Sequence, residues 1–194
     1  MRFLGTLLLL LMASVSAHAD PLRDAQAAYD RGLYARALEI WRPLAEQGNA
    51  EAQAGLANLY LGGYGATRDE AEAMAWFRKA ADQGNASGQF SLGSLYYGRK
   101  DYGSAAPWYR RAAEQGHAIA QVRLGRMYAE GLGVGRDDAQ AYKWFAVAAT
   151  RSSDNYARSN ALQGRDSVAG RLTPNQRALG QKLAVDWTPK RERQ

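Results

Sequence analysis

The feature that most constrains the fold is a tripeptide that returns at nearly even spacing. Gln-Gly-Asn stands at 47–49 and 83–85, and Gln-Gly-His stands at 115–117, so the spacings are 36 and then 32 residues. After each copy, small and apolar residues recur three and four apart, a spacing that places them on one face of a helix. In the three units these positions are Ala50, Ala52, Leu56, Ala57, Leu59 and Tyr60; Ala86, Gly88, Leu92, Gly93, Leu95 and Tyr96; and Ala118, Ala120, Leu124, Gly125, Met127 and Tyr128.

A second helix is predicted in each unit. It begins at an aspartate that stands seven residues before a tryptophan, in the pairs Asp69 and Trp76, Asp101 and Trp108, and Asp137 and Trp144. Aspartate is a favoured N-cap, and Glu72 and Gln140 have the spacing of a capping box. An aromatic residue and two alanines follow each tryptophan, so we expect the tryptophans to lie in the core between closely packed helices. Gly84 and Gly116 fit left-handed positions at the helix ends.

One helix pair cannot bury its apolar face alone, so successive pairs must stack into an all-α solenoid. The predicted units are a divergent helix pair at 20–48, repeats at 49–84, 85–116 and 117–153, and capping helices with a basic tail at 154–194. In the last unit, Thr173 and Gln176 flank Pro174 as a capping box, and Leu179, Leu183 and Trp187 share one stripe. Pro107 leaves two alternatives open, because its helix either starts nearer Ser104 or kinks.

Residues 118–149 resemble the Sel1-like repeat, through Ala118-x-Ala120, Leu124-Gly125, Tyr128, Gly131-x-Gly133, Asp137, Trp144 and Ala148-Ala149. Residues 49–84 match the same pattern, whereas 85–116 lack the Gly-x-Gly segment and look closer to the related tetratricopeptide repeat. The resemblance implies a right-handed α-solenoid that acts as an adaptor, and several exported bacterial members are implicated in envelope functions. A cysteine-rich branch was named for β-lactamase-like activity. This chain has no cysteine, so that activity is not carried over.

The N-terminal residues 1–19 have the pattern of a secretory signal. Arg2 precedes an apolar run, and Ala17-His18-Ala19 provides a small-x-small cleavage pattern. We therefore expect cleavage after Ala19 and a periplasmic or secreted product with no integral membrane segment; an uncleaved anchor is the alternative. Loss of Arg2 reduces the basic residues from 25 to 24 against 19 acidic ones. Outside the cytoplasm this excess does not favour nucleic acid, and a solvated basic surface is the simplest interpretation.

Catalytic groups are scarce in this sequence. Without cysteine and with only His117 after the signal, zinc motifs and Ser–His–Asp arrangements lack their parts. The glycine clusters 62–65 and 131–135 follow predicted helices, not strands, so they indicate turns with positive φ rather than phosphate loops. Glu130 and Asp138 are the candidates for an acid and a base acting on a sugar, but we interpret them as surface charges. We therefore expect that the protein is not an enzyme and that it binds no metal ion or cofactor.

Binding is the remaining role. In such a solenoid the first helices line the concave side, and residues between their packing positions face outward. The candidate partner-binding residues are Glu51, Asn58, Leu61, Phe90, Ser94, Tyr97, Ile119, Val122, Arg126 and Glu130. Phe90, Tyr97 and Arg126 are types that anchor interfaces, although the two rings could instead pack locally.

The sequence therefore predicts a non-catalytic scaffold that binds a peptide or helix of an unidentified envelope protein. One alternative is a protein that binds glycan or the envelope surface, with weak anionic contact through Lys190, Arg191 and Arg193. A hydrolase of the β-lactamase-like branch is a further alternative.

Overall fold

The computed structural model describes residues 20–190, and this part of the chain consists of ten helices joined by short turns. The predicted signal segment 1–19 and the tail residues Arg191 and Arg193 lie outside it. The helices are α1 (Pro21–Asp30), α2 (Tyr34–Glu46), α3 (Ala50–Gly62), α4 (Glu70–Asp82), α5 (Ala86–Gly98), α6 (Tyr102–Glu114), α7 (Ala118–Glu130), α8 (Asp138–Arg151), α9 (Asn155–Ala169) and α10 (Pro174–Val185). None of these helices is long and apolar enough to cross a membrane.

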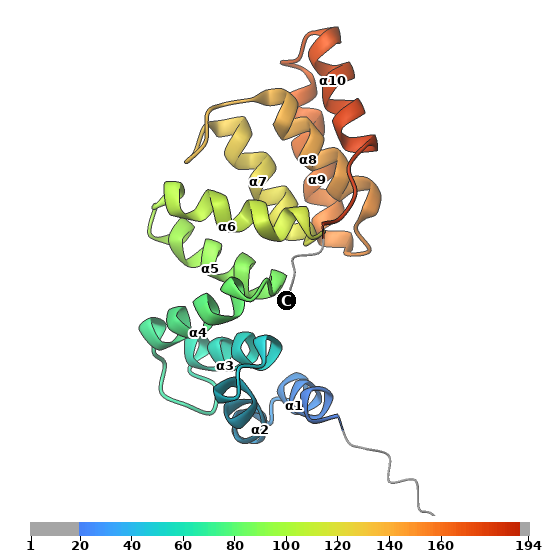
Figure 1. The fold of residues 1–194 in the computed structure, drawn as a ribbon. Coiled ribbons are helices and arrows are strands. Elements are labelled where there is room, and N and C mark those ends of the chain that lie inside the picture. The colour runs from blue at the N-terminus through green and yellow to red at the C-terminus, as the bar shows by residue number, and fades with distance from the viewer. Residues whose placement is uncertain (1–19, 191–194) are drawn as a thin grey trace, which may run out of the picture.

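The helices stack as consecutive pairs along one axis, from α1 at one end to α10 at the other (Figure 1). Each helix through α9 packs chiefly against its neighbours in the chain, and α1 also contacts α3, α3 contacts α5, and α7 contacts α9. α10 departs from this pattern because it packs back on α8. The predicted all-α solenoid of helix pairs is confirmed.

Side-chain caps fix where the helices begin. Asp69, Asp101 and Asp137 cap α4, α6 and α8 as predicted. The predicted capping boxes are formed only in part, since among the described helices α10 alone has both halves, made by Thr173 and Gln176. The Glu72 carboxylate of α4 instead accepts a hydrogen bond from Trp76 Nε1 at 2.7 Å.

The repeated tripeptide gives each of its residues a separate role at the junction between units. Gly84 and Gly116 have φ of 88° and 98°, left-handed values that end the preceding helix at little steric cost. The next residue caps the following first helix, because Asn85 Oδ1 accepts from the Gly88 N–H at 2.8 Å and His117 Nδ1 accepts from the Ala120 N–H at 3.2 Å.

The glutamine of the tripeptide bonds back to a buried glutamine near the start of its own unit. Gln83 Nε2 donates to Gln53 Oε1 at 2.7 Å, and Gln115 Nε2 donates to Gln89 Oε1 at 2.8 Å. The two acceptors are buried, and each donates its own Nε2 to a carbonyl at the end of the preceding second helix. Gln121 makes the same bond to a carbonyl, that of Ala113. Buried polar groups must be paired. These glutamines bond to one another within a unit, and the buried ones also bond to carbonyls of the unit before.

The aromatic core differs from the prediction by one residue. Phe77, Tyr109 and Phe145, which follow the tryptophans, are at most 1% exposed. Trp144 is buried, but Trp76 and Trp108 are only partly buried and pack against the edge of the core, so their assignment to the core holds only in part. One residue along a helix turns the side chain by about 100°, which carries these two indoles from the helix interface toward the surface. There the Lys79 ammonium and the Arg111 guanidinium lie over their rings.

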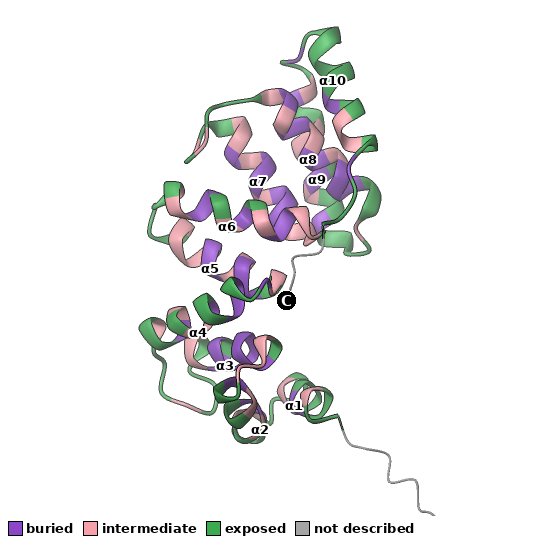
Figure 2. Ribbon diagram, viewed as in Figure 1, coloured by how far each residue is buried: buried purple, intermediate pink, exposed green. Residues whose placement is uncertain are grey.

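The C-terminal unit confirms some local expectations and corrects others. α6 begins at Tyr102 with Pro107 inside it, so a start nearer Ser104 is wrong. The proposed stripe of α10 packs only in part: Leu179 is 51% exposed, whereas Trp187 is 8% exposed and lies just beyond the helix. Figure 2 shows α10 mostly in the colour of exposed residues.

We predict that Phe77→Ala lowers the free energy of unfolding by about 3–5 kcal/mol, because it leaves a cavity in the core. Trp76→Ala provides a matched control one residue away and should have a clearly smaller effect. Urea unfolding followed by circular dichroism measures both variants. A loss for Trp76→Ala as large as that for Phe77→Ala would contradict the observed packing.

Candidate partner-binding face

The first helices α1, α3, α5, α7 and α9 form one side of the solenoid, which we call the first-helix face. Of the predicted partner-binding residues, three are exposed: Glu51, Asn58 and Glu130. Six are partly buried: Leu61, Phe90, Ser94, Tyr97, Ile119 and Arg126. Val122 is 4% exposed and was wrongly placed at the surface. α9 covers it, with Tyr156 and Ala157 lining the same small space, and the sequence pattern of α7 did not reveal that contact.

A hollow of about 280 Å³ opens at the N-terminal end of this face. Its lining comes from α1, α2 and α3 and from the start of α5, and comprises Gln26, Tyr29, Trp41, Glu51, Ala54, Gly55, Asn58, Asn85 and Ser87. The Trp41 ring forms the floor against Gly55, where a Cβ atom would lie 2.6 Å from the indole. Glu51 is the only charged side chain in the lining, so the hollow offers aromatic surface, amides, hydroxyls and one carboxylate.

Aromatic rings form the middle of the face. The Phe90 ring stacks on the His117 ring, with centroids 4.5 Å apart and an interplanar angle of 19°. The Tyr97 ring meets the Tyr102 ring edge-on at 5.0 Å, and the Arg123 guanidinium lies 5.9 Å above the Tyr97 ring. These neighbours hold the Phe90 and Tyr97 rings in place, so both rings pack locally, which was the alternative to an exposed interface anchor. Both residues are nevertheless only partly buried.

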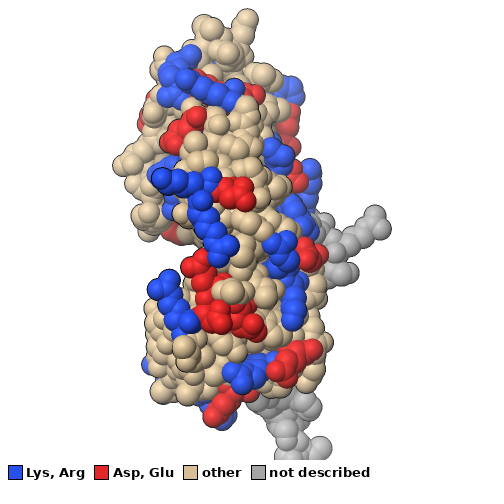
Figure 3. Space-filling view, turned by 90° about the vertical axis from the view of Figure 1, so that its left-hand side faces the viewer, with Lys and Arg blue, Asp and Glu red and all other residues tan. Residues whose placement is uncertain are grey.

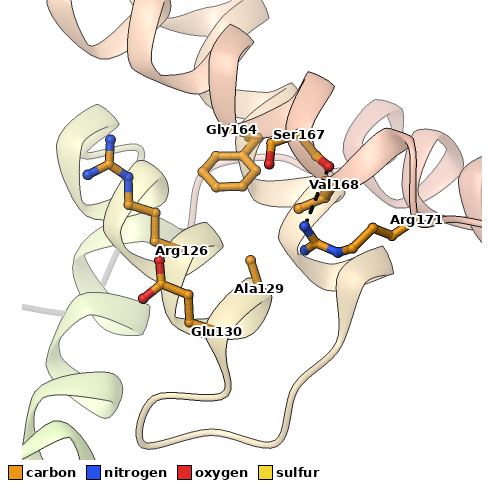
Figure 4. A pocket seen from close by; sticks show the side chains of 8 residues that line it. Arg126, Ala129, Glu130, Gly164, Ser167, Val168 and Arg171 are labelled. Atoms are coloured by element: carbon orange, nitrogen blue, oxygen red, sulfur yellow. Dashed lines mark hydrogen bonds between the residues drawn. The ribbon is translucent and has the colours of Figure 1, made fainter.

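Basic residues gather at the C-terminal end of the face. Arg126 Nη2 donates to Asn160 Oδ1 on α9 at 2.8 Å. Figure 4 shows Arg126 and Glu130 on one side of a second hollow, of about 260 Å³, with Ser167 and Arg171 on the other side. Arg171 is engaged at this site, because its guanidinium pairs with Asp138.

Asp138, one of the two carboxylates considered for acid–base chemistry, is held as an ion. Its oxygens accept hydrogen bonds from Arg171 at 2.5 Å and from Arg136 at 3.2 Å. These arginines, Arg171 first, keep the pKa of Asp138 below its ordinary range, so it does not hold a proton to donate near neutral pH. Within residues 20–190 no three side chains of the His, Cys, Asp and Glu types gather closely enough to hold a metal ion.

His117 has a role that the sequence reasoning missed. Burial lowers its pKa, and its Nδ1 accepts the Ala120 N–H as the cap of α7, which requires the neutral ring. A signal for this was present, because Asn49 and Asn85 occupy the same place in the other units and asparagine is a preferred N-cap.

The fold and this face define a helical-repeat protein whose candidate site is an extended surface with shallow hollows, not an enclosed pocket. A sequence model of the Sel1 repeat matches residues 50–85, 86–117 and 118–153, including the shortened middle unit. A Sel1 repeat protein from Oxalobacter formigenes is 36% identical over 66% of this chain and 98% of its own length, with a TM-score of 0.58. The chain belongs to the Sel1 repeat family.

A second solved structure extends the comparison. The protective antigen c5321 of uropathogenic Escherichia coli strains, which displays an SLR fold, is 31% identical over 86% of this chain, with a TM-score of 0.48. The matched region is 44% of that antigen's length, so this chain spans less than half of it. No curated protein matches the chain.

We predict that the stability of the protein depends on pH through His117. Because its pKa is lowered in the folded state, the unfolded chain binds a proton first as the pH falls through the ordinary value of about 6.5. The free energy of unfolding should therefore not depend on His117 above that pH, and it should decrease as the pH falls below it.

His117→Asn is the matched variant, since asparagine caps the equivalent helix in the other units. Urea titrations of the untagged chain at a series of pH values should show that the variant loses less stability than the wild type below about pH 6.5. Parallel curves for the two proteins would contradict the role assigned to this histidine.

Proposed function

We propose that this chain is a non-catalytic scaffold of the bacterial envelope that binds a segment of a partner protein along its first-helix face. The observation that carries the proposal is the hollow around Glu51 and Asn58, on the same first-helix face as the fixed rings of Phe90 and Tyr97. Aromatic side chains held in place by neighbours give up little conformational freedom on binding, which favours affinity. Sel1 repeats are generally protein-interaction scaffolds, which supports a protein partner.

The charges on the face support a particular chemistry for that partner. Glu51 is the charged residue of the N-terminal hollow, whereas Arg123 and Arg126 lie toward the C-terminal end. A complementary segment therefore carries a basic side chain for the Glu51 hollow and an acidic one near the two arginines. Complementary charges of this kind fix the direction and register of a bound segment more than they add affinity.

The envelope location rests on the sequence of residues 1–19, which has the pattern of a cleaved export signal. The alternative of anionic-surface binding receives less support. Lys190 is already paired with Glu114 at 3.3 Å, and Figure 3 shows acidic and basic side chains intermingled along one side of the molecule. A surface with mixed charges does not produce the positive electrostatic potential that would attract an anionic surface.

We predict that a photocrosslinking amino acid at Asn58, introduced into the chain in cells of the source organism, captures one envelope protein. Asn58 is exposed and lies on the rim of the N-terminal hollow, so the replacement leaves the fold intact. The control position is Glu39 on α2, which is also exposed but belongs to a second helix. The same set of products from both positions would argue against a specific face.

Charge reversal tests whether the captured protein occupies the proposed face. Glu51→Lys and Arg126→Glu, each combined with the crosslinker at Asn58, should greatly reduce capture because each places like charges together. Arg36→Glu on α2, an exposed site, serves as the matched control and should leave capture unchanged. Capture that persists through both reversals would exclude the charge pattern proposed for the partner.

A further inference from the structure

The chain doubles back after its last helix. Asp186–Lys190, here called the tail segment, leaves the end of α10 and runs past α8 toward the end of α6 (Figure 1). The Lys190 N–H donates to the Glu114 carbonyl at 2.8 Å, and Lys190 Nζ lies 3.3 Å from the Glu114 carboxylate. The tail segment thereby satisfies a carbonyl at the C-terminus of α6, where helix carbonyls lack partners within the helix.

Trp187 is the apolar anchor of the tail segment. Its ring meets the Trp144 ring edge-on at 6.4 Å, and it belongs to the buried cluster that includes Ala113 and Val147. The Arg151 guanidinium lies 5.4 Å over its face. Together these groups form a slot between the end of α6 and the middle of α8, which we call the indole slot.

The indole slot is specific to the third unit. In the two preceding units, the residue three positions after the tryptophan is Lys79 or Arg111, and its cation lies over the indole of its own unit. In the third unit this position is Val147, and the cation over Trp144 comes instead from Lys143, 4.2 Å from the ring centroid. The edge of Trp144 on the Val147 side is therefore open to an apolar ring from outside the unit. Trp187 fills that opening.

The fit of the tail segment is incomplete. Trp187 Nε1 is buried and makes no hydrogen bond, the single such side-chain atom in the described residues, and an unpaired buried donor opposes burial by about 1–3 kcal/mol. Lys190 also brings a positive charge toward Lys143, whose pKa is lowered first by burial and further by Lys190. The tail segment follows a helix with only one buried residue, Gly180, so the contacts of Trp187 and Lys190 are what hold it in place.

From these contacts we propose that the indole slot is a peptide-binding site which the chain's own tail segment keeps closed. The occupant that opens it is an extended segment of a partner protein with an aromatic residue followed, three positions later, by a basic residue. The tail segment itself supplies this chemistry, because Trp187 fills the slot while Lys190 reaches Glu114. The slot lies at α6 and α8, on the second-helix side, so this site is separate from the first-helix face.

The occupant need not be tryptophan. A phenylalanine side chain fills apolar space without burying an unpaired N–H, so a partner with phenylalanine avoids the penalty that the tail segment carries. The tethered tail segment competes at a high effective concentration, of the order of millimolar for a short connection. The closed state therefore lowers the apparent affinity for a free peptide by the fraction of molecules in which the slot is open.

The test is a titration of the full chain with the capped peptide Asp-Trp-Thr-Pro-Lys, which reproduces the tail segment, followed by NMR signals of the Glu114 and Gly116 amides. Trp187→Ala vacates the slot, and this variant should bind the peptide at least about tenfold more tightly than the wild type. The same peptide with alanine in place of tryptophan is the control and should not bind. Absence of binding of the tryptophan peptide to a folded Trp187→Ala chain would overturn the proposal.

A second measurement uses the wild-type chain and does not depend on the variant folding. The indole N–H of Trp187 should exchange with solvent about a hundredfold faster than the amide of buried Leu124, because the tail segment opens locally while the core stays folded. Lys190→Ala should accelerate that exchange further, whereas Arg36→Ala, on the distant α2, should not. An indole that exchanges only as fast as Leu124 opens with global unfolding, and that result would exclude a releasable tail segment.

Discussion

The structure depends on the contact of aromatic rings with helix positions that carry little or no side chain. The Phe145 ring lies between two glycines, and a Cβ atom at Gly125 or Gly164 would come within 2.9 Å and 2.5 Å of it. Tyr109 packs in the same way against Gly93. Since protein interiors are packed to crystal-like density, these rings set how closely the helices approach. The hydrogen bonds between the units form only at that separation.

Hydrogen bonds at the junctions between units add to the packing of the rings. In Gln-Gly-Asn, the glutamine bonds to a buried glutamine of its own unit, the glycine ends one helix and the asparagine starts the next. Each buried glutamine in turn donates to a carbonyl of the previous unit. The interior therefore contains polar side chains that are paired across units. Such bonds specify which unit follows which, and they join neighbours in a chain whose stability is otherwise a sum of local interfaces.

The two sides of the solenoid carry different kinds of surface. The first-helix face presents hollows and fixed rings with a carboxylate at one end and arginines at the other. The second-helix side presents tryptophans covered by cations, and at Trp144, which Lys143 covers, the ring of Trp187 from the tail also packs edge-on. These are the two surfaces on which we propose that partners bind.

The sequence by itself determined the helix pairs, the aspartate caps, the left-handed glycines and the stacked architecture, because these follow from local periodicity and backbone conformation. Residue spacing also predicted several exposed positions of the candidate face, including Glu51 and Asn58. Only the tertiary structure decided that Phe77 rather than Trp76 enters the core, that α9 covers Val122, and that Trp187 folds back on Trp144. These outcomes depend on contacts between distant segments. Helical periodicity indicates which face of a helix a residue lies on, but it does not indicate which element packs against that face.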